Sequence, residues 1–456
     1  MSTVIEHKKY VCTDALNNNN KFWEYFLHDD GTVIVKYGRV GKTVNVDDPK
    51  PMTRAELDRK IREKTKGRGV EGTPSYKPPY REIAVVAEAS VVNDTSTPSI
   101  SKIVVKEAAI SQLASGCSEL SKLVERLVEA NRHELYKASG GQMDIDLKTG
   151  IISTPLGVIT KDTVAEARKM LNILDPFVQS RDFDSKTFIE SLNAYLMLVP
   201  QTVGHSKGWH RNFFNKHNAL VQQNTLLDQL ESSADIAAAR LIAAKDQSVK
   251  TDLSSTPSLF NAQLEILTDK DVIKMIEKKF FDTINTRHET RNMKPIRFYA
   301  VKMPDQSEAF DQNILIWDKQ KKVDKNVWML WHGTRMFNVL SILKSGLFCP
   351  PSCGSYHVTG RMFGDGIYGS DQSTKALNYA YGYWDGGTRD RNCFMFLVDF
   401  AMGKYHVPSG PARHFPAGYD STFAKANMSG VMNNEMIVYK NNQVNIRYLV
   451  EFEEKR

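Results

Sequence analysis

The spacing of apolar residues changes twice along this chain of 456 residues, and these changes restrict the folds that it can form. Between about 110 and 250, apolar residues recur every three or four positions, as in Leu120, Leu123 and Val124, which predicts amphipathic helices. From about 290 to the end, short apolar runs and glycine-rich loops predict strands. At ~150 residues per domain, the length predicts about three domains. We therefore expect a multidomain α+β protein.

The composition is that of an ordinary globular protein. Hydrophobic residues make up 41% and charged residues 25%, which argues against a fibrous or wholly disordered chain. No apolar run reaches the ~18 residues of a membrane-spanning helix, and the first ten residues lack the apolar core of a secretory signal. Five cysteines do not predict a disulfide framework, so we expect a reducing compartment. The net charge of +7 permits a polyanionic partner without demonstrating one.

The first 85 residues predict a small antiparallel sheet with one helix. Two β-prone runs, 21–27 and 31–41, flank an Asp-Gly pair, and this arrangement predicts a hairpin. Thr53 and Glu56 match a capping box, which predicts a helix that continues to about Lys66. The six basic residues of that helix fit either an ordinary solvated face or a phosphate contact.

The middle of the chain predicts a helical bundle. Residues 86–107 are rich in Ser, Thr and Val and contain no aromatic residue, as is typical of a linker. Beyond it, helical spacing recurs in 120–128, 164–174, 188–199 and 220–236. This segment contains no glycine-rich phosphate loop and no histidines at metal-binding spacing, so the bundle alone predicts no chemistry.

The last third mixes strands and helices without regular βαβ alternation, which favours α+β over a doubly wound sheet. The strand candidates are 296–302, 313–317, 327–333, 393–400, 435–439 and 443–452. Helices are expected near 336–343 and 372–381. In the final strand we expect one face to carry Val444, Ile446, Tyr448, Val450 and Phe452.

Two polar residues stand where apolar strands end or begin. His332 closes one strand and is followed by Gly333, so a ring nitrogen and an unobstructed backbone face a ligand. Taken alone, a histidine with a local hydrogen bond is the simpler interpretation. Glu435 opens another strand, where a carboxylate is costly unless it is paired or functional.

Two tyrosines lie near a glycine-rich loop. Tyr368 stands within 363–370, whose glycines allow its ring to line the mouth of a pocket. Tyr379 follows in the predicted helix, and two rings can enclose a flat heteroaromatic ligand. The alternative is that both are core residues.

Taken in order, these motifs resemble those of the poly(ADP-ribose) polymerases. The matching segments are HGT (332–334), FGDGIY (363–368), NY (378–379), NNE (433–435) and QVNIRYL (443–449). Upstream, 155–161 and 188–204 resemble parts of the regulatory helical domain of that family. Residues 37–41, YGRVG, resemble its WGR signature with Tyr37 in place of Trp.

The resemblance implies a short DNA-dependent member of the family without zinc fingers. It implies a WGR domain with a small antiparallel sheet, an all-α bundle, and an ADP-ribosyltransferase domain with split antiparallel sheets. The expected boundaries are 1–85 for the WGR DNA-binding domain, 86–109 for a linker, 110–255 for the regulatory helical domain and 256–456 for the catalytic domain.

The resemblance also implies roles for individual residues. His332, Tyr368 and Glu435 would form the catalytic triad of chain-extending members, so we expect poly(ADP-ribose) rather than single units. NAD+ would be the substrate, and no metal is expected. The residues implied to bind NAD+ are His332, Gly333, Thr334, Arg335, Asn338, Tyr368, Lys375 and Tyr379. Glu435 would bind a ribose hydroxyl and polarise the acceptor hydroxyl.

Two departures from the family pattern bear on NAD+ affinity. Ala376 stands where the family has a serine that hydrogen-bonds the nicotinamide carboxamide, a loss of about 0.5–1.5 kcal/mol. Phe348 stands where an arginine near the adenine is usual, and its ring can stack on the base.

The implied partners are DNA breaks with a 5′-phosphate, bound through Tyr37 and Arg39, and protein acceptors that include the enzyme itself; no membrane partner is expected. DNA contact would relieve hindrance of the NAD+ site by the helical domain. The implied location is nuclear in a eukaryote and cytoplasmic otherwise. Two alternatives stay open: a DNA-end-binding scaffold with weak or absent activity, and a mono-ADP-ribosyltransferase or NAD+ glycohydrolase.

Overall fold

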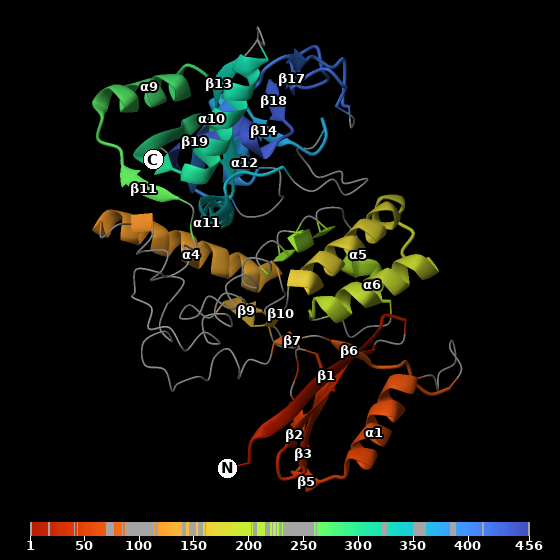
Figure 1. The fold of residues 1–456 in the computed structure, drawn as a ribbon. Coiled ribbons are helices and arrows are strands. Elements are labelled where there is room, and N and C mark those ends of the chain that lie inside the picture. Colours follow the sequence, from red (N-terminus) through yellow and green to blue (C-terminus); the bar gives the residue numbers. More distant parts are fainter. Residues whose placement is uncertain are drawn as a thin grey trace. The chain divides into compact units, whose positions relative to one another are not determined.

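Figure 1 shows the structure, a computed structural model, in which contacts divide the chain into two compact units that we describe separately. The first unit comprises Met1–Val104, His133–Ser255 and Gly354–Tyr356, and the second comprises Val105–Arg132, Thr256–Cys353 and His357–Arg456. The described residues are 2–16, 19–40, 42, 44–69, 77–83, 85–86, 113–114, 117–138, 143–145, 152–153, 158–159, 161–201, 203, 208–214, 219–220, 222–224, 226–227, 230, 260, 262–320, 326–349, 362–383, 389–412 and 415–454. The predicted linker 86–109 lies outside them except for Val86.

An antiparallel six-stranded sheet with one helix forms the start of the first unit, with strand order β4-β3-β2-β1-β6 and β5 paired to β3. Its elements are β1 (Val4–Asp14), β2 (Asn19–His28), β3 (Thr32–Arg39), β4 (Val44–Val46), β5 (Lys50–Pro51), α1 (Arg54–Lys66) and β6 (Arg81–Ile83). The predicted hairpin is confirmed as β2 and β3. Gly31 turns it at φ +80°, a conformation that favours glycine. The capping box of Thr53 and Glu56 is confirmed at the start of α1.

In the remainder of the first unit, as far as its residues are described, helices predominate, and α5 packs along α6 (Figure 1). The helices are α5 (Lys161–Ser180), α6 (Lys186–Leu198) and α7 (His210–Phe213), and the short strand pairs are β7 (Val85–Val86) with β10 (Val158–Ile159) and β8 (Asp144–Ile145) with β9 (Ile152–Ser153). The predicted apolar positions of 164–174 and 188–199, among them Leu171, Phe188 and Tyr195, are fully buried in one core. The predicted positions of 120–128 are buried too, but they belong to the second unit. Helical positions are therefore confirmed here, whereas Ile236 lies outside the described residues.

The described residues of the second unit form two sheets. A five-stranded sheet has the order β11 (Gln263–Ile266), β12 (Met293–Lys302), β19 (Val444–Glu454), β15 (Asn392–Ala401) and β13 (Val327–Thr334), and all its pairings are antiparallel. A four-stranded sheet has the order β14 (Ile367–Gly369), β18 (Glu435–Val438), β17 (Ser421–Ala424) and β16 (Tyr405–His406). The helices are α9 (Lys270–Phe281), α10 (Pro304–Lys319), α11 (Met336–Ser345), α12 (Ser373–Tyr381) and the part of α4 (Ser118–Ala138) up to Arg132. Two short 3₁₀ turns are η2 (Glu289–Asn292) and η3 (Asn441–Gln443).

The two sheets meet at Trp331 and Ser370. Trp331 N donates to Ser370 O at 2.9 Å, and Ser370 N donates back to Trp331 O at 3.0 Å. These bonds join the end of β13 to the residue after β14. Residues at the end of β13 and in β14 are thereby brought to one place, which is where the sequence motifs lie.

The prediction of a strand at 313–317 was wrong, because these residues belong to α10. Phe310, Asn313 and Trp317 are buried, at the i, i+3, i+7 spacing of one helix face, whereas Leu315 and Ile316 are about half exposed. The apolar run 313–317, which contains two isoleucines, has high β propensity. Pro304 at the first helical position and the helical spacing of the buried residues outweigh that local propensity.

The prediction of a single apolar face along 443–452 was also wrong. In the pairing of β19 with β15, Ile446 opposes Val398 while Tyr448 opposes Leu397, so Arg447 is an extra residue and forms a bulge. A bulge reverses the alternation beyond it. Val444 and Ile446 therefore lie on the opposite face from Tyr448, Val450 and Phe452, and both faces of this strand are covered.

Among the described residues, no helix combines the length and the apolar character needed to cross a membrane.

Candidate active site

His332 lies near the end of β13 and is held by the neighbouring sheet. Its Nδ1 lies 2.8 Å from the carbonyl oxygen of Tyr368, a contact in which Nδ1–H donates. Burial lowers the pKa of His332, so the ring is neutral at pH 7. The unprotonated Nε2 is then an acceptor for a ligand hydroxyl.

Gly333 is required by the close approach of α12. A Cβ placed there would lie 1.7 Å from the carbonyl oxygen of Ala376. Only glycine permits this approach, which brings the first turn of α12 against the end of β13. Gly333 thus determines how closely β13 and α12, which both line the pocket, approach each other.

Tyr368 is oriented by its own loop. Its hydroxyl accepts from Phe363 N at 3.0 Å and donates to Gly364 O at 2.8 Å. Both bonds anchor the phenol end, which leaves the ring face to line the pocket. Tyr379 enters the same pocket from α12, and burial and the charge of Glu435 raise its pKa, so it stays neutral.

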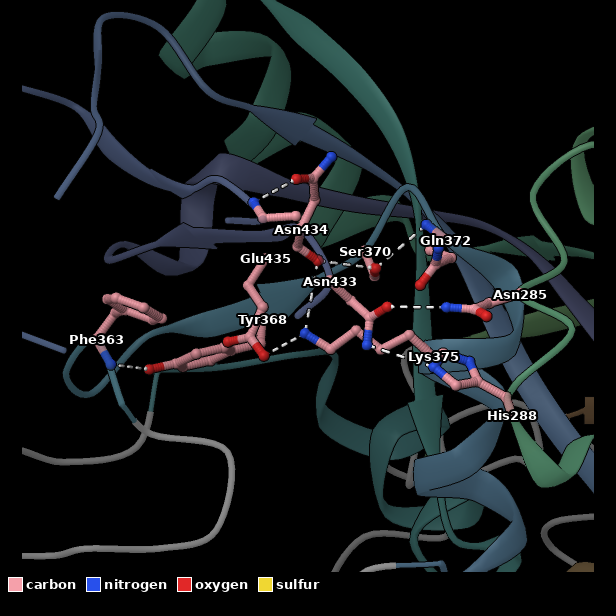
Figure 2. A network of polar contacts seen from close by, with 11 residues as sticks. Asn285, His288, Phe363, Tyr368, Ser370, Gln372, Lys375, Asn433, Asn434 and Glu435 are labelled. Atoms are coloured by element: carbon pink, nitrogen blue, oxygen red, sulfur yellow. Dashed lines mark hydrogen bonds and ion pairs between the residues drawn. The ribbon is translucent and has the colours of Figure 1, made fainter. Parts of the chain in front are cut away.

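Glu435 and Lys375 form a buried ion pair between β18 and α12 (Figure 2). Glu435 Oε1 accepts from Lys375 Nζ, and the two residues are 7% and 8% exposed. Burial lowers the pKa of Lys375, and the carboxylate of Glu435 opposes that shift. Glu435 Oε2 is buried and has no partner among the described residues. A buried oxygen without a partner is costly, so it marks where a ligand donor fits.

One pocket brings most of the predicted residues together. Its volume is about 400 Å³, within the size range of small-molecule sites. Of the residues expected to act on NAD+, those that line it are His332, Gly333, Thr334, Asn338, Tyr368, Lys375, Tyr379 and Glu435. Ala376 and the half-exposed Phe348 line it too.

Three predicted residues lie elsewhere. Arg335 is not part of the pocket lining; its Nε donates to Asp390 Oδ2 at 3.0 Å at the start of α11. Tyr37 and Arg39 belong to β3 in the first unit, where strand alternation places them on the same face. Tyr37 is 41% exposed, which suits an external contact.

Sequence analysis missed a polar cluster behind Glu435, formed by Asn285, His288, Thr374 and Asn433. Its members are up to 148 residues apart, and no local motif contains them all. The Asn-Asn-Glu motif included Asn433 but gave it no role. Only the fold reveals the cluster.

A metal site does not emerge from the described residues, where no three His, Cys, Asp or Glu side chains gather around a common point. The pocket instead suits an organic ligand, because two tyrosines, a neutral histidine, the backbone of Gly333 and a carboxylate oxygen with no partner among the described residues line it.

Comparison with known proteins agrees with this geometry. The sequence model of the poly(ADP-ribose) polymerase catalytic domain matches residues 270–429, and that of the regulatory domain matches residues 118–260. Neither match includes residues 1–117 or Glu435.

Three relatives illustrate the range of the similarity. The protein mono-ADP-ribosyltransferase PARP3 of Homo sapiens is 24% identical over 92% of this chain and 77% of its own length. Poly [ADP-ribose] polymerase 2 of Homo sapiens is 24% identical over 96% of this chain and 78% of its own length. A putative poly [ADP-ribose] polymerase-like protein, 100L, of Invertebrate iridescent virus 6 is 31% identical over 34% of this chain and 85% of its own length.

The regulatory match followed by the catalytic match gives the order of domains in this family, and the pocket lies in the unit that holds the catalytic match. The chain therefore belongs to the poly(ADP-ribose) polymerase family and is an NAD+ ADP-ribosyltransferase.

Proposed function

We propose that this enzyme builds poly(ADP-ribose) on protein acceptors and is activated by DNA breaks. The observation that carries the proposal is the pocket that joins His332, Tyr368 and Glu435, where Glu435 Oε2 meets no partner within the described part of the chain. In the transfer, the bond between nicotinamide and ribose C1′ breaks and its electron pair leaves with the nicotinamide. The acceptor oxygen forms a new bond to C1′ and gives up its proton.

The pocket residues suit this chemistry. His332 Nε2 accepts from a ribose hydroxyl, the backbone of Gly333 holds the carboxamide, and the rings of Tyr368 and Tyr379 enclose the nicotinamide. Glu435 Oε2 binds the ribose 2′-hydroxyl, and its charge stabilises the positive charge that develops on the ribose. During elongation the same oxygen accepts the proton of the attacking hydroxyl. Thr334 and Asn338 lie towards the adenosine end.

Poly rather than mono transfer rests on Glu435. A carboxylate at this place polarises a sugar hydroxyl, which is the acceptor when a chain grows. The second candidate is mono-ADP-ribosylation, and the specific observation that favours it is the PARP3 relatives, whose names state that activity. Other relatives are named poly [ADP-ribose] polymerase, so the names of the relatives do not decide between poly and mono transfer.

DNA activation rests on the N-terminal sheet, which we propose to be a WGR domain. The half-exposed ring of Tyr37 offers a stacking surface, and Arg39 shares its face of β3. On α1, the exposed residues Arg59, Arg62 and Lys66 follow i, i+3, i+7 spacing and form one cationic row. Such a row suits phosphate contacts. If the source is a eukaryote, we expect this DNA-activated enzyme to act in the nucleus.

Nicotinamide release from NAD+ tests the proposal. The full chain is assayed with no DNA, with an intact circular duplex, and with a nicked duplex that carries a 5′-phosphate. We expect release to rise about tenfold or more only with the nicked duplex. Equal release in all three reactions would remove DNA activation, and DNA binding without any release would favour the scaffold alternative.

A further inference from the structure

We propose that His288 is a positioning residue of this active site, which holds the turn before Glu435 against the helix that carries Lys375 (Figure 2). His288 Nδ1 lies 2.9 Å from Thr374 Oγ1, and His288 Nε2 lies 3.4 Å from Asn433 Nδ2. Thr374 directly precedes Lys375, and Asn433 lies two residues before Glu435. One ring therefore spans the two segments that form the buried ion pair.

Asn285 makes a parallel connection. Its backbone N–H donates to Thr374 Oγ1 at 2.9 Å, and its side-chain Nδ2 donates to Asn433 Oδ1 at 3.4 Å. Figure 2 shows Asn285 and His288 on the same side of Asn433. Two residues of one segment thus reach the same two partners, His288 through its ring and Asn285 through its backbone N–H and its side chain.

The hydrogen bonds determine the role of each ring nitrogen. Asn285 Oδ1 accepts from Arg287 N at 3.0 Å, so its amide nitrogen faces Asn433. Asn433 Oδ1 accepts from that nitrogen, which turns Asn433 Nδ2 towards His288 Nε2. The Nε2 atom therefore accepts, and Nδ1 carries the proton and donates to Thr374. Burial and the charge of Lys375 lower the pKa of His288, which keeps the ring in this neutral form.

The segment that carries His288 is itself firmly attached to α12. Ser373 N donates to Thr283 Oγ1 at 3.2 Å, and Ser373 Oγ donates to Phe280 O at 2.7 Å. At the other end, Thr290 Oγ1, 1% exposed, lies 3.1 Å from Thr374 O and 2.9 Å from Asn378 Oδ1. Because both ends are fixed to α12, His288 extends from a rigid base to Asn433.

Asn434, the next residue of the turn that precedes Glu435, is held by hydrogen bonds of its own. Asn434 Nδ2 donates to Asp371 Oδ2 at 2.8 Å, Asn434 O accepts from Ser370 Oγ at 3.0 Å, and Asn434 Oδ1 accepts from Ala426 N at 2.9 Å. Loss of His288 would leave the Asn433 side of the turn held, among the described residues, only by the 3.4 Å bond from Asn285 Nδ2 to Asn433 Oδ1, while the bonds of Asn434 remain. The expected result is a small displacement of Glu435 relative to Lys375 rather than unfolding.

His288 is not part of the pocket lining, so its effect is expected on the chemical step and not on NAD+ binding. A misplacement of ~1 Å in a catalytic group costs on the order of 100-fold in rate. This inference rests on the proposed role of Glu435.

The test is steady-state nicotinamide release by the full chain in the presence of nicked duplex. His288→Ala is expected to lower kcat about tenfold or more, with KM for NAD+ changed less than twofold and the melting temperature changed little. His288→Gln, whose amide can still meet Asn433, is expected to recover most of kcat. Arg287→Ala, an exposed neighbour in the same segment, is the matched control and should leave kcat unchanged.

If His288→Ala folds poorly, a double-mutant cycle of His288 and Asn433, measured by kcat, still tests the positioning role. Asn433→Ala removes the other end of the contact without touching α12, and the pair of substitutions should cost no more than the larger single one. Unchanged kcat in both single variants, or full additivity, would overturn the positioning role. If Glu435→Gln, measured in parallel, also leaves kcat unchanged, the proposed role of Glu435 fails instead.

Discussion

Lys375 and Glu435 are partners in a buried ion pair that uses only one of the two carboxylate oxygens of Glu435. The Lys375 ammonium lies against the Glu435 carboxylate in a buried place, and the other carboxylate oxygen has no partner among the described residues. The pocket thus holds a carboxylate oxygen beside two tyrosine rings, an arrangement that suits the proposed stabilisation of a cationic sugar.

Loss of the Glu435 charge should stop chain growth. Glu435→Gln keeps the size of the side chain but can neither accept a proton nor stabilise a cation. We expect kcat for nicotinamide release to fall about 100-fold or more, in the range for loss of an acid–base group. Glu453→Gln is the matched control, because the Glu453–Lys294 pair is exposed and contributes little.

Substitution of Gly333 should abolish the pocket. In Gly333→Ala the new Cβ meets the Ala376 carbonyl oxygen, so β13 and α12 must separate. We expect loss of nicotinamide release and a lower melting temperature. Gly410→Ala is the control, since a Cβ there meets nothing within 4 Å and should be tolerated. Normal activity of Gly333→Ala would contradict the close approach of α12.

A serine at position 376 should strengthen NAD+ binding. Ala376→Ser supplies the hydroxyl that the family uses for the carboxamide, at a position that lines the pocket. A gain of about 0.5–1.5 kcal/mol corresponds to a KM roughly 2- to 12-fold lower. Ala380→Ser, one turn later and 1% exposed, places a hydroxyl in the core and should lower stability without changing KM. An unchanged KM in Ala376→Ser would mean that the carboxamide lies elsewhere.

Glu451 should make stability depend on pH. The residue is 1% exposed and accepts from Arg126 at 2.8 Å, Asn392 at 3.0 Å and Arg297 at 3.2 Å. Burial alone would raise its pKa, but the hydrogen bonds and charge of Arg126, with Asn392 and Arg297, hold that pKa below the ordinary value.

The sign of the pH effect follows from this depressed pKa. The stabilisation is fully present above the unfolded pKa of about 4.3 and is lost as pH falls through the folded pKa. Glu451→Gln should therefore lower the free energy of unfolding by about 1–3 kcal/mol at pH 7, and the difference from wild type should shrink below about pH 4. Denaturant titrations at several pH values measure it. A difference that grows on acidification would contradict the assignment.

Removal of Arg39 should separate DNA activation from catalysis. Arg39→Ala should weaken binding of the nicked duplex. It should also reduce the slope of the logarithm of the binding constant against the logarithm of the salt concentration by about the contribution of one phosphate contact. Nicotinamide release without DNA should stay as in wild type. Arg81→Ala, exposed on β6 of the same sheet, is the control. Equal effects of the two substitutions would point to general charge attraction and not to a contact at Arg39.

The sequence predicted those parts of the site that lie in short motifs. His332, Tyr368 and Glu435 stand in contiguous segments, and the fold brings these segments to one pocket. Residues 313–317 were predicted wrongly because local β propensity competes with helical burial, and only the packed partners of Phe310 and Trp317 decide between them. The bulge at Arg447 depends on register against β15, and the contacts of His288 depend on residues 86 and 145 positions away. Neither can be predicted from local spacing.

Product length on a denaturing gel is the most direct test of the central claim. Wild type and Glu435→Gln are incubated with labelled NAD+ and the 5′-phosphorylated nicked duplex. We expect a ladder of long chains for wild type and no ladder for Glu435→Gln. A single added unit from wild type would show that the enzyme transfers one ADP-ribose, and an unchanged ladder from Glu435→Gln would contradict the role given to that carboxylate.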